Sequence, residues 1–265
     1  MKNIKHYLFF LIFLTSLSCA ASAKKINQEN STDLSVEADI SIEWFEKEKY
    51  YLAKGNVILK KNGLTLKANI IKAEYGIENG ENILKNITAK EEVIITKDKL
   101  KATGQFMTYD VEKKIVIISG SFQTFSSPTG YVESKKIIMF DDLKNKAEAA
   151  GNVKIILSNK NVVFADSVKA DFTAKDKSLH KAVAKGNVII EGKDKIKKSK
   201  ADLGIYNSSD DIVRLLGNVT IINQNSILNG SKGITNLKTG ISNIIGNPEK
   251  KERVKGIFSP IKKNK

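Results

Sequence analysis

The stretch Gly186-Asn187-Val188-Ile189-Ile190 places a Gly-Asn-Val triplet in front of β-branched residues. Further copies of the triplet, exact or degenerate, begin at Gly55, Glu91, Gly120, Gly151 and Gly217. A period of roughly 30 residues with β-type content is typical of one strand unit repeated along the chain. The triplet therefore predicts a stack of similar units, each opening a short strand, and not an enzyme with a single pocket.

The runs that follow the triplets alternate with a period of two. In Val153-Lys154-Ile155 the apolar residues fall on one face and the lysine on the other. Turn signals such as Lys61-Asn62-Gly63 separate the runs, and the whole chain holds only three prolines, as expected of strands inside a continuous sheet. The sequence predicts an all-β fold of stacked strand repeats.

A small residue recurs roughly thirteen positions after each start, at Ala68, Ala102, Ser134, Ala165, Ser199 and Gly230. Small residues alternating with Val, Ile and Leu suit a concave apolar wall that leaves space inside. They also suit tight packing between two sheets, and spacing alone leaves both interpretations open.

The first residues read as a targeting segment. Lys2 and Lys5 precede the apolar run from Tyr7 to Leu14, and Ala21-Ser22-Ala23 is a cleavage site, so residues 1–23 are expected to be a signal peptide of an exported, soluble protein. Lipidation at Cys19 is a minor alternative, because Ser16 stands where a lipoprotein signal has leucine. Residues 24–33 are expected to be a flexible polar segment and 248–265 a basic tail.

The residue types left after cleavage disfavour catalysis. The mature chain has no cysteine, and its one histidine, His180, lies in a polar stretch where a solvated loop is expected. No metal site, nucleotide-binding loop or cofactor is therefore predicted. The formal net charge of +15 suits lysines on solvated strands or an anionic lipid partner. Sparse aromatics and export argue against nucleic acid.

Two segments resemble a known family. Val36 to Tyr75 contains Ala38-Asp39, Ala53-Lys54-Gly55-Asn56-Val57-Ile58-Leu59 and Leu64-Thr65-Leu66-Lys67-Ala68-Asn69, and a second match runs from Ala102 to Gly151. In order and spacing these elements resemble the OstA-like domain of the LptA family of periplasmic lipopolysaccharide transport proteins. The resemblance places this domain at residues 34–247.

The resemblance implies an elongated, slightly twisted β-jellyroll with an open groove that shelters the acyl chains of lipopolysaccharide. It also implies homo-oligomers joined by edge-strand pairing, and a bridge between an inner-membrane LptC-like and an outer-membrane LptD-like protein. The positions expected to line the groove, or else to form ordinary core, are Val57, Leu59, Leu66, Phe106, Phe122, Val153, Ile155, Val188 and Ile190. Because this set rests on strand phase, a register error of one residue would invert it.

Four alternatives remain. An LptC-like partner of the same pathway would keep an uncleaved membrane anchor, and an LptD-like translocon would need a long β-barrel after the domain. A β-solenoid surface or adhesion protein would share the repeats but have a filled interior. A polysaccharide-active enzyme would need clustered carboxylates, for which only Asp141-Asp142 and Asp210-Asp211 offer pairs, both in turn-like contexts.

Overall fold

The structure, a computed structural model, describes residues 34–193, 197–223, 226–236, 242–247, 249 and 252–258. The expected signal peptide and the segment 24–33 lie outside these residues. Every regular element that the structure describes is a β-strand, and every pairing between the strands is antiparallel, which confirms the all-β prediction.

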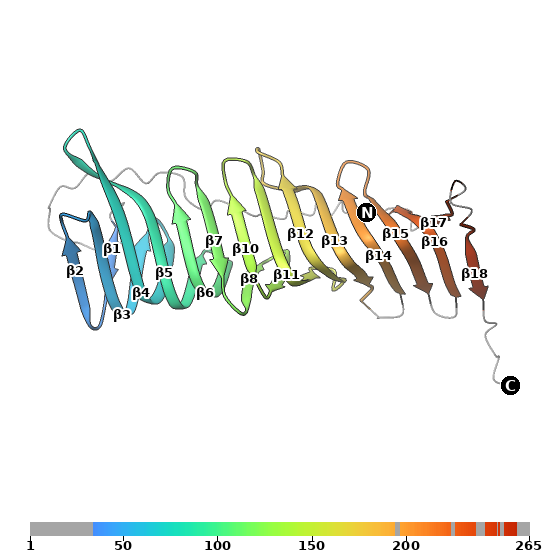
Figure 1. Cartoon of the computed structure of the whole chain (residues 1–265), viewed down its shortest axis with the longest axis horizontal. Coiled ribbons are helices and arrows are strands. Elements are labelled where there is room, and N and C mark those ends of the chain that lie inside the picture. The colour runs from blue at the N-terminus through green and yellow to red at the C-terminus, as the bar shows by residue number, and fades with distance from the viewer. Residues whose placement is uncertain are drawn as a thin grey trace. The chain divides into compact units, whose positions relative to one another are not determined.

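The described strands belong to two compact units. The N-terminal unit comprises residues 34–128 and Lys135–Asn145, and the C-terminal unit comprises Thr129–Ser134 and the residues from Lys146 onward. Within each unit, most strands that follow one another in sequence lie side by side (Figure 1).

The N-terminal unit contains nine of the described strands. They are β1 (Ser35–Glu37), β2 (Ser41–Phe45), β3 (Tyr50–Lys61), β4 (Leu64–Glu78), β5 (Glu81–Lys97), β6 (Leu100–Asp110), β7 (Ile115–Ser119), β8 (Gln123–Ser127) and β10 (Ile137–Asp141). The long strands β3 to β6 pair in sequence order. One end of β6 pairs with β7 and the other end with β8, while β10 pairs with β7.

The C-terminal unit contains the other nine. They are β9 (Gly130–Ser134), β11 (Lys146–Leu157), β12 (Val162–Phe172), β13 (Leu179–Glu191), β14 (Lys197–Asn207), β15 (Ile212–Asn223), β16 (Ser226–Asn236), β17 (Ser242–Ile245) and β18 (Lys255–Phe258). Strand β9 pairs with β11, and β11 to β16 pair in sequence order. Both β17 and β18 pair with β16, so part of the expected basic tail is a strand of the sheet.

The Gly-Asn-Val triplets lie inside strands and not at their starts. Each exact copy coincides with a break in the pairing register, as between Lys185 and Val188 in β13. Gly186 and Asn187 both have positive φ, at 75° and 47°. Two left-handed residues face a single residue of the neighbouring strand, which makes a bulge that bends the strand. The triplet therefore encodes a corner, after which the same strand continues.

The residue types of the corner follow from its geometry. Glycine and asparagine adopt the left-handed region most easily. A Cβ added at Gly186 would lie only 2.8 Å from Cγ of Asp166 on β12. The Asn187 amide donates hydrogen bonds of 3.1 Å to both carboxylate oxygens of Asp166. Asn218 donates in the same way to Asp202 on β14, and Asn56 to Asp39 just before β2, so an aspartate that precedes the corner in sequence holds each of them.

Candidate functional site

The candidate site is the inward face of the strands, the face that carries the buried side chains of each unit. The most deeply buried row of this face is formed by the valines of the Gly-Asn-Val triplets. The valine is buried in every copy but one, at Val57, Val93, Val153, Val188 and Val219. Directly opposite stand the small residues Ala68, Gly104, Ala165, Ala201 and Gly230. In two copies the small residue differs from the expected one: Gly104 and Ala201 take this position, while Ala102 and Ser199 pair with Ile95 and Ile190.

Seven of the nine predicted site residues lie on this inward face. In the N-terminal unit Val57 and Leu59 alternate along β3, and Leu66 lies directly opposite Leu59. In the C-terminal unit the corresponding residues are Val153, Ile155, Val188 and Ile190. All are buried except Ile155 and Ile190, which are half-buried.

Phe106 and Phe122 are not on the inward face, and that part of the prediction is wrong. Phe106 is 45% exposed and pairs with Lys90, whereas its neighbour Met107 is buried. The corner explains the error: β6 contributes one residue, Gln105, against two in β5, so its inward positions change from even to odd numbers. A strict period of two from Ala102 therefore selects Phe106 on the wrong face.

Phe122 fails because its copy of the motif contains an extra residue. Thr124 pairs with Thr103, which places Gln123 opposite Gly104 in the row that valine occupies elsewhere. Phe122 is 47% exposed and Gln123 is fully buried. Neither Oε1 nor Nε2 of Gln123 has a hydrogen-bond partner.

The sequence also missed the inward residues beyond each corner. These are Ile71, Ala89, Ile87, Tyr109, Val116 and Phe140 in the N-terminal unit, and Ala149, Val168, Ala184 and Leu215 in the C-terminal unit. Tyr75 and Phe172 are buried among them as well. The signal that would have found them is on the strand facing each corner, where one residue opposes two and the inward positions change between even and odd numbers.

The inward faces of the two units are filled differently. In the N-terminal unit, one row of directly paired residues is mostly bulky and mostly buried: Tyr51, Ala73, Ile87, Tyr109, Val116 and Phe140. The corresponding row of the C-terminal unit begins with three alanines: Ala147, Ala170, Ala182, Tyr206 and Val213. Across the corner, Ile155, Val163, Ile190 and Ile221 face inward but are only half-buried. Apolar surface therefore stays accessible on this inward face.

Inward-facing residues of the first strands are exposed. Ile42 and Trp44 of β2 pair with Ala53 and Tyr51, yet they are 55% and 57% exposed. The Trp44 indole donates a 2.8 Å hydrogen bond to the Tyr75 hydroxyl and stacks on the Tyr51 ring. At the other end of the chain, Ile257 and Phe258 of β18 are exposed as well. Each unit thus presents an apolar terminal strand to its surroundings.

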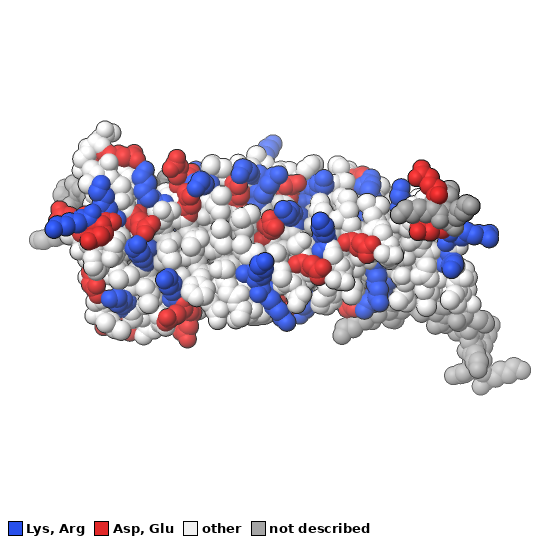
Figure 2. Space-filling model, viewed as in Figure 1, with Lys and Arg blue, Asp and Glu red and all other residues white. Residues whose placement is uncertain are grey.

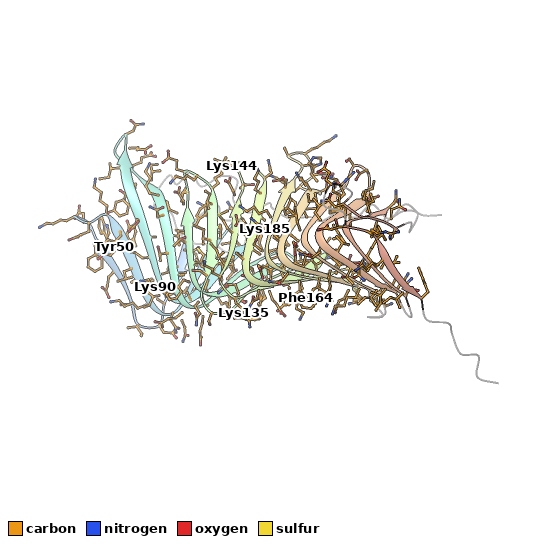
Figure 3. All side chains as sticks on the ribbon, turned by 45° about the vertical axis from the view of Figure 1, so that its right-hand side comes forward. Tyr50, Lys90, Lys135, Lys144, Phe164 and Lys185 are labelled. Carbon is orange, nitrogen blue, oxygen red and sulfur yellow. The ribbon has the colours of Figure 1, made fainter. Side chains whose placement is uncertain are left out.

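The outward face carries interspersed charges of both signs (Figure 2). Cross-strand ion pairs such as Lys54–Glu43, at 3.0 Å, and Lys198–Glu191, at 2.8 Å, join neighbouring strands. The Ser41 hydroxyl and then Lys54 hold the pKa of Glu43 below its usual value. Lys90 and Lys185 come just before the corners of β5 and β13, and both are labelled in Figure 3.

The paired carboxylates have structural roles. Asp141 accepts a hydrogen bond from the Lys144 backbone amide and forms a 3.0 Å ion pair with the Lys144 ammonium. Arg214 donates to Asp210 at 2.7 Å and lowers its pKa, while Asp211 accepts from the Tyr206 hydroxyl. His180 is exposed near the start of β13 and not in a loop.

The described part of the chain has neither a cluster of metal-ligating side chains nor a membrane-spanning helix. It contains no group of three or more His, Cys, Asp or Glu side chains placed to hold a metal ion. Its regular elements include no helix long and apolar enough to cross a membrane.

The geometry defines a class of protein: an all-β chain of repeated strands that bend at corners and carry an apolar inward face. Comparison with known proteins then gives the family. The family model described as LptA/(LptD N-terminal domain) LPS transport protein matches residues 35–142 and 131–241. The chain belongs to this family of lipopolysaccharide transport proteins.

No curated protein matches the chain. Among solved structures, the crystal structure of LptH, the LptA-homologous periplasmic component of the lipopolysaccharide transport device of Pseudomonas aeruginosa, is similar at 12% identity. The match covers 86% of this chain and 96% of that one, with a TM-score of 0.23.

Proposed function

We propose that this protein is a non-enzymatic periplasmic carrier that binds the acyl chains of lipopolysaccharide on its inward face. The observation that carries the proposal is the accessible apolar surface of the C-terminal unit. There Ile155, Ile190 and Ile221 face inward and are half-buried, beside rows of alanine and glycine. Family membership supplies the class of cargo.

The energetics favour such a surface. Each CH₂ group moved from water into an apolar environment gains about 0.8 kcal/mol, so one twelve-carbon chain exposed to water would lose roughly 10 kcal/mol. A carrier must offset this cost with apolar surface that its own fold leaves unfilled. Inward-facing isoleucines that keep part of their surface in water meet that requirement.

Mass spectrometry of lipid that co-purifies with the protein tests the proposal. The protein should be exported from a cell that makes lipopolysaccharide and purified without detergent. We expect bound lipopolysaccharide, and we expect Ile190→Glu to reduce the bound amount while the outward-facing Ile189→Glu leaves it unchanged. Lipid-free protein, or equal loss in both variants, would contradict the assignment.

We further propose that the protein assembles end to end through its terminal strands, with itself and with LptC-like and LptD-like proteins. Exposed Ile42 and Trp44 on β2, and exposed Ile257 and Phe258 on β18, form the two apolar strands that such pairing would cover. Sedimentation over a range of concentrations should show growing oligomers. Ile42→Lys and Phe258→Lys should each prevent this growth, because each places an unpaired charge on the inward side of a strand that assembly would cover. Outward-facing Ile189→Lys is the control.

A further inference from the structure

We infer that the end of the inward face formed by the β3–β4 and β5–β6 turns binds a phosphate group of the lipid whose acyl chains the protein carries. The inference rests on the proposed function and locates the headgroup on this chain. It starts from Lys61, the last residue of β3, which is only 8% exposed. Along β3 the buried positions alternate as Val57, Leu59 and Lys61, so this lysine lies on the inward face.

A second lysine shares the same cross-strand row. Leu64 of β4 pairs with Lys61 on one side and with Lys97 of β5 on the other. Directly paired residues of antiparallel strands lie on the same face, so Lys97 also faces inward and is half-buried. Two strand spacings separate the two lysine backbones, about 9–10 Å. The flexible side chains can converge on one ligand from that separation.

Lys61 carries a charge that no described carboxylate pairs with. Among the described residues, Lys61 has no acidic partner within ion-pair distance, while its outward neighbour Lys60 pairs with Glu37 at 3.6 Å. The second turn reads Lys97-Asp98-Lys99-Leu100-Lys101 and adds further positive charge. Lys61 therefore keeps a positive charge on the inward face without a carboxylate partner, and an anion bound at this position would supply one.

The position is specific to the first two full repeats. Lys61 and Lys97 each stand four residues after the deep valine of their corner, Val57 and Val93. The same position in later copies holds the neutral residues Leu157, Gly192 and Asn223. A general need for solubility would not confine inward lysines to β3 and β5.

The chemistry of the ligand follows from its surroundings. A lysine ammonium is a compact point charge with three donors and suits a phosphate oxygen. Leu59, Leu64 and Leu66 on the adjoining inward face are apolar, which suits the acyl part of the same molecule. An amphiphile with a phosphate close to its acyl chains therefore fits this end better than a free anion does.

Binding measurements on the mature protein test the inference with two probes, a bisphosphorylated lipid A and the same lipid with both phosphates removed. Lys61→Met should weaken binding of the phosphorylated lipid about tenfold, the loss of one charge-assisted contact. It should leave the dephosphorylated lipid unaffected, and Lys61→Arg should retain most of the affinity. Lys60→Met, which removes the adjacent outward charge, is the matched control and should change neither.

The outcomes are separable. If the wild-type protein binds neither lipid, the proposed function itself fails. If it binds both lipids equally well, or if Lys61→Met binds like Lys60→Met, the carrier function stands and the phosphate site is refuted. Displacement of the lipid by millimolar inorganic phosphate would identify a free-anion site and would also overturn the inference. Thermal unfolding should show Lys61→Met to be about as stable as wild type, since methionine keeps the buried apolar part of the side chain and no ion pair is lost.

Discussion

Replacing Gly186 by alanine tests the physical basis of the strand corner. Gly186 has a φ of +75°, and Gly63 in the β3–β4 turn has a φ of +76°, so alanine meets the same backbone cost at both sites. That cost is about 1 kcal/mol. The surroundings differ: a Cβ at Gly63 would have nothing within 4 Å, whereas at Gly186 it would meet Cγ of Asp166 at 2.8 Å.

The added methyl group at Gly186 must displace the Asp166 carboxylate from the Asn187 amide. Loss of this solvent-exposed, charge-assisted contact adds about 1–2 kcal/mol to the backbone cost. We therefore expect Gly186→Ala to destabilise the C-terminal unit by about 2–3 kcal/mol, and Gly63→Ala to destabilise the N-terminal unit by about 1 kcal/mol. In an Asp166→Ala background, Gly186→Ala should cost less, about 1–2 kcal/mol, because the carboxylate is gone and only the contact with Cβ of residue 166, at 3.0 Å, remains.

Urea unfolding gives the free energies, and hydrogen exchange of the β13 and β14 amides reports the C-terminal unit by itself. Equal destabilisation by Gly186→Ala and Gly63→Ala, together with no coupling between Gly186 and Asp166, would show that the aspartate does not hold the corner.

Three further predictions concern the N-terminal unit. Gln123→Val should stabilise it by about 1–3 kcal/mol, because the carboxamide is buried without a partner where other repeats have valine; a lower urea midpoint would refute this. Glu91→Gly with Glu92→Asn should raise stability by about 1–2 kcal/mol in the same assay, since both glutamates have positive φ; an unchanged midpoint would count against strain at this corner. Burial raises the pKa of Tyr109 to about 12 from 10.0, so its contribution is complete below pH 10 and is lost as the pH rises toward 12. Tyr109→Phe should therefore lose less stability over that interval than wild type, and identical pH profiles would exclude a role for this ionisation.

The sequence was sufficient for the fold class and for the deep row of the inward face. The Gly-Asn-Val spacing marks every exact corner, and period-two alternation after Val57, Val153 and Val188 selects the correct face. Both signals are local, because they depend on the φ preference of glycine and asparagine and on the pleat of one strand.

The rest depends on how neighbouring strands pair. Whether a strand contributes one or two residues at a corner is a property of the pair, which is why Phe106 was assigned to the wrong face. The extra residue before Gln123 becomes visible only through the pairing of Thr124 with Thr103. The pairing of β18 with β16 is also non-local, so the tail showed no strand signal in the sequence.

Photo-crosslinking from Ile190 and Ile189 tests the central claim most directly. The two isoleucines are adjacent in β13 and are both half-buried, but they lie on opposite faces of the strand. A photoreactive residue at position 190 should crosslink to lipopolysaccharide in cells, and one at position 189 should not. Equal labelling from both positions, or labelling from 189 alone, would contradict the claim that the inward face carries the lipid.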